Sequence, residues 1–152
     1  MTISANDEIT MPSQPAFLAT VGSQQNNITN DGNLQTVTFS SEVFDQNSDF
    51  NTSNYTFTAP VTGKYIFNLL LYLLNIDTGA TYYSTQVITS NRTYVAEIDP
   101  NFSADLDRYG VQMSILADMD ASDTVTVQIL QVSGTSQTDI ATDSFFSGSL
   151  IC

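Results

Sequence analysis

The chain has almost none of the side chains that support nucleophilic or metal–thiolate catalysis. It contains no histidine, and its single cysteine, Cys152, is the last of 152 residues. Ser-His-Asp, Cys-His and zinc–cysteine sites all need residues that are missing here, and no disulfide can form within the chain. Paired carboxylates remain, such as Asp105 and Asp107, but loop carboxylates are common turn residues. We therefore expect a protein that is not an enzyme and that is stabilised by packing alone.

Basic residues are nearly absent as well. Lys64, Arg92 and Arg108 are opposed by sixteen acidic residues, which gives a formal net charge of -13. Binding to phosphates requires clustered lysine and arginine, so nucleic acid is excluded as a partner of the surface, and an anionic membrane would repel the chain. Only 12% of residues are charged, and Ser, Thr and Asn take their place. Such a surface is common in fibre and shell proteins, because its solubility does not depend on charges that salt screens.

Long hydrophobic runs are also missing. The longest, residues 65–76, has twelve residues and is interrupted by Asn68, whereas a membrane helix needs about 18. The first residues, Met1 to Asp7, have neither a basic start nor an apolar run, so we expect no Sec export and synthesis in a cytoplasm. Residues 1–14 are polar and predict an N-terminal arm for attachment, and residues 15–152 predict one domain.

What the chain has in abundance is alternation of apolar and polar residues with a period of two, which is typical of half-buried strands. In residues 34–44 it places Val37, Phe39 and Val43 on one face. In residues 64–74 both faces are largely apolar, so something besides the sandwich core must cover the second face. The pattern predicts an all-β protein. Further strands are expected at residues 17–21, 55–60, 82–89, 93–98, 109–116, 124–132 and 145–151, with a hairpin turn at 90–92.

The spacing of aromatic residues around the central run follows a known signature. The positions are Phe39, Asp45, Phe50, Phe57, Gly63, Tyr65 and Phe67, and only the last place differs, where Leu69 stands for Tyr or Phe. This spacing resembles the globular head domain of complement first component q. Residues 15–19 and 146–150 look like the opening and closing strands of those heads, and residues 122–125 resemble their Gly-Asp-x-Val turn with Ser in place of Gly.

The resemblance implies a single ten-stranded jelly-roll β-sandwich that forms a homotrimer and is related to the tumour necrosis factor superfamily. It places Tyr65, Phe67 and Leu69 in the core. The sequence has no collagen-like stalk, so the head itself or the arm would have to provide oligomerisation and tethering. The expected trimer interface consists of Ile66, Asn68, Leu70, Tyr72, Phe146, Gly148 and Leu150.

The acidic residues suggest calcium as a ligand, because calcium takes six to eight oxygen ligands and loops supply them readily. Asp118, Asp120 and Asp123 are the candidate ligands. The alternative is that they are turn residues, and Asp123 matches the family's turn position, which is structural. No other cofactor is expected.

Two functions fit these features. The first is a trimeric structural or recognition protein on a virus, most simply a bacteriophage: a capsid decoration, a head fibre or a tail-tip knob. It would be made in the host cytoplasm, reside on the virion surface, contact capsid or tail proteins through residues 1–14, and meet a host-surface glycan or protein. The alternative is a secreted or cell-surface complement-like domain that recognises protein or carbohydrate. A third possible function, a cytokine-like ligand of a receptor, is supported only by analogy of fold.

Overall fold

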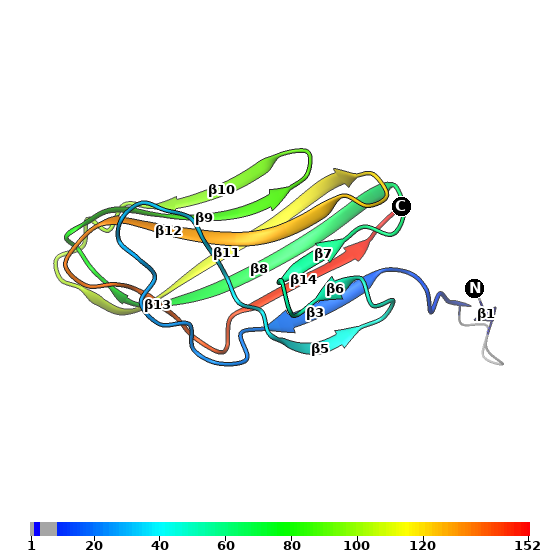
Figure 1. Ribbon diagram of the computed structural model, residues 1–152, viewed down its shortest axis with the longest axis horizontal. Helices are drawn as coiled ribbons and strands as arrows, with labels where there is room; N and C mark the ends of the chain where they lie inside the picture. Colours follow the sequence, from blue (N-terminus) through cyan, green and yellow to red (C-terminus); the bar gives the residue numbers. More distant parts are fainter. Residues whose placement is uncertain (1, 4–8) are drawn as a thin grey trace.

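The computed structural model describes residues 2–3 and 9–152, and every regular element in them is a β-strand. No helix in this part of the chain could cross a membrane. Two antiparallel sheets pack face to face (Figure 1), and each has a path of five strands plus one short additional strand. The expected jelly-roll sandwich is therefore confirmed: the two five-strand paths account for the ten expected strands, and each sheet has one short strand more.

The chain crosses repeatedly between the two sheets, as in other jelly rolls. The first sheet has the order β11 (Leu106–Met119), β8 (Gly63–Ile76), β14 (Phe145–Leu150), β3 (Ala16–Thr20), β5 (Ser41–Asp45), with β13 (Asp139–Ile140) paired to β8. The second has the order β10 (Thr93–Ile98), β9 (Ala80–Thr89), β12 (Thr124–Ser133), β7 (Thr56–Thr58), β6 (Phe50–Asn51), with β4 (Gln35–Thr36) paired to β12.

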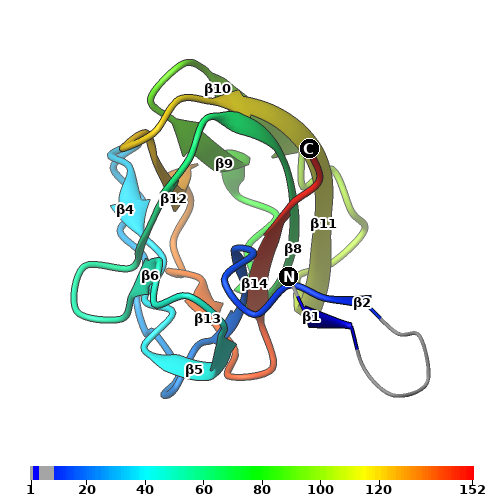
Figure 2. The same ribbon diagram turned by 90° about the vertical axis from the view of Figure 1, so that its right-hand side faces the viewer.

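A third, separate element is the hairpin of β1 (Thr2–Ile3) and β2 (Ile9–Thr10). Figure 2 shows it beside the sandwich, at the end of the molecule where Cys152 also lies. Residues 11–15 connect it to β3, and the side chain of Gln14 donates a hydrogen bond of 2.8 Å to the carbonyl of Leu150. The two termini of the described chain therefore share one end of the sandwich.

Strand β8 is an interior strand of the first sheet, because it pairs with β11 along its length and with β14 on its other side. Its side chains alternate as predicted. Tyr65, Phe67 and Leu69 are almost completely buried, and Leu71 and Leu73 continue the same row. Its other face is only partly buried.

Aromatic rings join the two sheets in the core. Phe57 of the second sheet stacks on Phe17 of the first, with ring centroids 5.0 Å apart, and meets Phe67 edge-on at 5.5 Å. Phe146 lies 5.2 Å from Phe17 and 5.8 Å from Phe67. Large buried rings of this kind dominate core energetics, and they explain how the fold holds without a disulfide.

The single strand predicted for residues 34–44 is wrong. Residues 35–36 form β4 in the second sheet, residues 37–40 cross the end of the sandwich, and residues 41–45 form β5 in the first sheet. Val37 and Phe39 are fully buried, whereas Val43 is 61% exposed. The alternation fails because the chain changes sheets between them, and because a register shift interrupts the pairing of β5 with β3.

Other strand boundaries differ less. The hairpin at residues 90–92 is confirmed, since the N–H of Thr89 donates to the carbonyl of Arg92 at 2.9 Å and β9 pairs with β10. Strand β11 extends beyond the expected residues 109–116 at both ends. Asp118, expected in a loop, therefore lies in a strand.

Candidate interaction surface

The outer face of the first sheet carries a row of apolar side chains that the sandwich leaves partly exposed. On β8, the residues Ile66, Asn68, Leu70 and Tyr72 alternate with the buried row and point away from the core. This facing was predicted from the sequence, and the structure confirms it.

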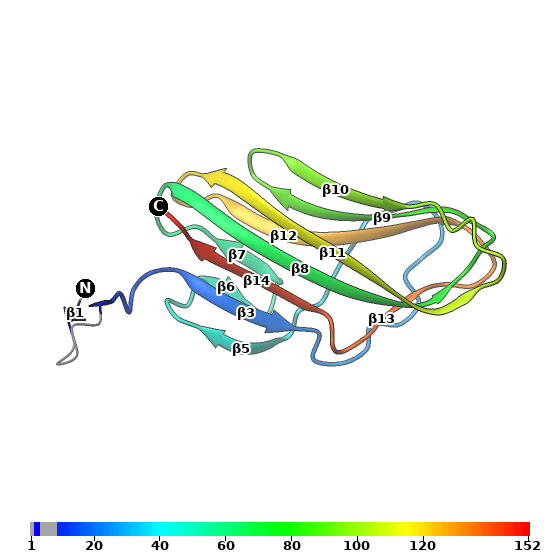
Figure 3. The same ribbon diagram turned by 180° about the vertical axis from the view of Figure 1, so that it is seen from behind.

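Further apolar side chains lie on the neighbouring strands of this sheet, which are side by side in Figure 3. Polar side chains lie between them, since Gln112 pairs with Leu70 and Ser114 donates a hydrogen bond of 2.8 Å to Asn68. Leu116 of β11 pairs with Ile66, and Phe145 of β14 pairs with Leu70. At the other edge, Leu18 of β3 pairs with Phe44 of β5. Leu116 is 60% exposed and Phe44 is 49% exposed, so apolar groups are open to solvent at both edges.

The closing strand presents different residues from those predicted. Phe146 pairs with Leu69 and Gly148 with Phe67, and residues opposite one another in neighbouring strands share a face. Phe146 is fully buried, and a Cβ atom on Gly148 would lie 2.5 Å from Phe67 Cδ1. The assignment of Phe146 and Gly148 to the trimer interface is therefore wrong.

Leu150 belongs to the same inward row, because it pairs with Tyr65 and packs against the core while remaining partly exposed. The outward positions of β14 are Phe145, Ser147 and Ser149. The prediction assumed that the even-numbered residues of β14 face outward. In the structure the register of β14 with β8 places them inward, and a register that differs by one residue moves every side chain to the opposite face.

Charged groups are confined to the ends of this face. Lys64 and Asp118 are cross-strand partners at one end. Arg108, at the other end, forms an ion pair with Asp143, and its guanidinium lies 3.8 Å from the ring centroid of Tyr72. The middle of the face has no charge, so covering it would desolvate no ion.

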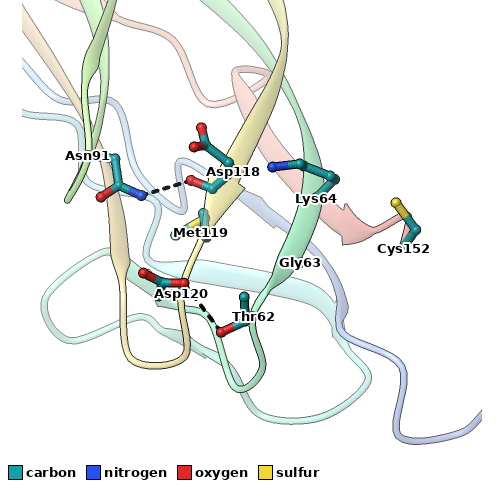
Figure 4. Close-up of a pocket in the computed structure, with 8 residues that line it drawn as sticks. All are labelled: Thr62, Gly63, Lys64, Asn91, Asp118, Met119, Asp120 and Cys152. Atoms are coloured by element: carbon teal, nitrogen blue, oxygen red, sulfur yellow. Dashed lines mark hydrogen bonds between the residues drawn. The ribbon is translucent and has the colours of Figure 1, made fainter.

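A shallow cleft of about 420 Å³ lies beside the turn after β11 and contains the predicted calcium ligands Asp118 and Asp120 (Figure 4). Asp118 Oδ1 accepts a hydrogen bond of 2.6 Å from Arg92, with which it forms an ion pair. The backbone carbonyl of Asp118 accepts a bond of 2.9 Å from the amide of Asn91. The carboxylate of Asp118 is thus already paired with a cation of the protein.

The third candidate, Asp123, closes the turn itself. Its Oδ2 accepts hydrogen bonds from the backbone N–H of Asp120 at 2.8 Å and from the amide of Asn91 at 2.9 Å. Within residues 2–3 and 9–152, no three His, Cys, Asp or Glu side chains are grouped closely enough to hold a metal ion. The structure thus gives Asp123 the turn role and does not bring the three candidates together.

The comparisons with known proteins agree with this architecture. A family model described as "C1q domain" matches residues 16–151. The globular domain of zebrafish complement 1qA is 20% identical, with 91% of this chain and 98% of that chain covered and a TM-score of 0.61. Two structures of murine APRIL are 12% and 11% identical, with TM-scores of 0.62 and 0.64, and cover 91% of this chain and 99% of theirs. No curated protein matches. At these identities the solved structures show the likeness of the fold.

Proposed function

The chain belongs to the C1q domain family, and on that premise we propose that it works as a homotrimeric, non-enzymatic recognition module. The observation that carries the proposal is the partly exposed apolar face of the first sheet, which runs from Leu116 through Ile66, Leu70 and Phe145 to Phe44. Clustered, partly exposed apolar side chains of this kind mark interaction sites in soluble proteins.

The outer face of the second sheet mixes polar and apolar side chains. Gln86 and Gln128 are cross-strand partners there, Thr126 is paired with Ile88, and Tyr82 is paired with Val132. Its amide and hydroxyl side chains can remain hydrated. The first sheet supports the trimer, because burying aliphatic and aromatic side chains stabilises an assembly by roughly 25 cal/mol per Å².

Recognition without catalysis is supported by the side chains that the described residues offer. The chain has no histidine. The acidic residues beside the turn after β11 are engaged by Arg92, Asn91 and backbone N–H groups. These contacts are those of turn residues.

We propose the surface of a virus, most simply a bacteriophage, as the setting of this trimer. The support is compositional: one cysteine in 152 residues and 12% charged residues. A fold without disulfides suits assembly in a reducing cytoplasm. Residues 1–14 would then tether the trimer to capsid or tail proteins. Detection of the chain in purified virus particles tests this setting, and its recovery only from a culture medium would favour the secreted, complement-like alternative.

The trimer face is tested by replacing Leu70 with aspartate. Three carboxylates would be buried close together without partners, and each costs several kcal/mol. We expect Leu70→Asp to run as a folded monomer in size-exclusion chromatography with light scattering.

Ile88→Asp is the matched control, because Ile88 is a partly buried, outward-facing aliphatic residue of the second sheet. We expect it to keep the mass of the wild type. A Leu70→Asp protein with the mass and melting temperature of the wild type would contradict the proposed interface.

A further inference from the structure

A second cleft lies at the end of the sandwich opposite the termini, on the left in Figure 1. Its volume is about 390 Å³, and it opens between the turn after β8, the start of β11, and the loops that precede β4 and β13. It is lined by Asn27, Asn75, Ile76, Asp105, Leu106, Asp107, Ser136 and Gln137. The volume falls at the lower end of the range of about 300–1,000 Å³ that small-molecule sites occupy.

The lining offers both hydrogen-bond donors and acceptors that the described residues do not use. The side-chain amides of Asn27 and Gln137 have no partner in the described chain, and neither does the carboxylate of Asp107. Asp105 uses Oδ1 to accept hydrogen bonds from the N–H and the hydroxyl of Thr78, at 2.8 and 2.6 Å, and keeps Oδ2 open. Between these polar groups, the partly exposed side chain of Leu106 provides apolar surface, whereas Ile76 is fully buried beneath the cleft.

Two buried carboxylates hold the walls of this cleft in place. Asp139, only 9% exposed, accepts the N–H of Asn27 at 2.7 Å and the amide of Asn75 at 3.0 Å. Asp77, 4% exposed, accepts the N–H of Ser136 at 2.7 Å. Asn27 and Asn75 both have φ of 58°, in the left-handed region, which few residues other than glycine adopt without support. The backbone at Asn27 and Ser136 and the side chain of Asn75 are therefore held before any ligand arrives, which lowers the ordering cost of binding.

We propose that this cleft binds a neutral sugar residue of a glycan. A cation would bind the oxygen atoms of the lining and make no use of the amide N–H groups of Asn27 and Gln137. An anion offers only acceptors, and it would meet Asp105 and Asp107 with no lysine or arginine among the lining residues. A sugar hydroxyl both donates and accepts, so it satisfies carboxylates and amides together, and the C–H face of the ring can lie on Leu106.

The inference rests on the proposed recognition function and names its ligand class. It does not depend on the trimer, because every lining residue comes from one subunit. The leading rival ligand is a peptide, whose backbone also offers donors and acceptors. The unused hydrogen-bonding groups of this cleft are separate side chains around a compact volume. An extended peptide would instead pair with the backbone of a strand edge, so the arrangement favours a ring.

The test is an NMR titration of the ¹⁵N-labelled full chain with the methyl glycosides of glucose, galactose, mannose and N-acetylglucosamine. Methyl glucuronide and a capped alanine dipeptide serve as the anionic and peptide probes. We expect saturable shifts of the side-chain amides of Asn27, Asn75 and Gln137 with at least one neutral glycoside and none with the other two probes. Absence of shifts with all four neutral glycosides, or shifts with the dipeptide alone, would overturn the proposal.

Two variants sharpen this result. Asp107→Ala and Gln137→Ala remove exposed groups without hydrogen bonds in the described chain, so folding should be unaffected. Each should weaken sugar binding about fivefold, the equivalent of one hydrogen bond. Asp120→Ala, in the cleft at the other end, is the control and should bind as the wild type does.

The mass of each sample, measured by light scattering, separates the two proposals. Sugar binding by a monomeric wild type would refute the trimer and leave this inference standing. A trimer that shows none of these amide shifts would refute the inference alone.

Discussion

Replacing Gly148 with alanine should destabilise the subunit, because β14 packs its backbone directly against core rings at this residue. An added Cβ would lie 2.5 Å from Phe67 Cδ1, 2.7 Å from Phe67 Cε1 and 2.8 Å from Phe17 Cε1. Neither ring can withdraw freely. Phe67 is stacked on Phe146 at 5.8 Å, and Phe17 is stacked on Phe57 at 5.0 Å. One methyl group therefore has to displace two packed rings.

Overpacking a well-filled core costs about 1–3 kcal/mol. For a domain of this size, each kcal/mol lowers the melting temperature by about 2–4 °C. The assay is thermal and urea unfolding of Gly148→Ala at a fixed protein concentration, since assembly makes stability depend on concentration. Ser147→Ala is the neighbouring control, because Ser147 faces outward and is only partly buried.

The outcome distinguishes the two possible facings of β14. We expect Gly148→Ala to lose stability and Ser147→Ala to unfold close to the wild type. If Gly148→Ala unfolded as the wild type does while Ser147→Ala lost stability, the packing of Gly148 against Phe67 described above would be refuted.

Three further predictions follow from the core, the buried carboxylates and the turn after β11. Phe67→Ala should open a core cavity and cost roughly 3–5 kcal/mol of unfolding free energy, measured by urea denaturation; a loss below 1 kcal/mol would mean that the ring is not packed. Hydrogen bonds from the backbone N–H groups of Ser136 and Gly79 lower the pKa of Asp77 below its usual 3.8, so its stabilising effect is present above that pH and is lost as the pH falls through the lowered pKa. The stability difference between the wild type and Asp77→Asn should therefore shrink in urea unfolding series taken below pH 3.8, and a constant difference would contradict this role. If residues 118–123 bind calcium, a chelator should lower the melting temperature, whereas an unchanged midpoint would leave these acids with the turn role alone.

The sequence was most informative where a segment with one alternation pattern stays within one sheet. In residues 64–74 the alternation assigned every side chain to its observed face, because β8 stays in the interior of a single sheet over its whole length. The aromatic spacing predicted the jelly roll for a related reason. Phe57, Tyr65 and Phe67 are buried at the contact between the sheets, where few other side chains would fill the space.

It was least informative where the result depends on pairing between distant segments. Val43 continues the alternation of Val37 and Phe39, yet it is exposed because the chain changes sheets before β5. The facing of β14 depends on its register with β8, and the adjacent residues Phe145 and Phe146 do not reveal from sequence which of them meets the core. The sugar cleft was missed because its lining comes from four separate segments of the chain. Its only local signal was the pair Asp105 and Asp107, interpreted as turn residues.

The central claim, that three copies meet through the outer face of the first sheet, is tested most directly by the mass of the wild-type protein in solution. Light scattering during size-exclusion chromatography, at micromolar concentration, should give about three times the subunit mass of 16.6 kDa. A single species of 16.6 kDa under these conditions would show that the face formed by β11, β8, β14, β3 and β5 remains uncovered, and would contradict the account.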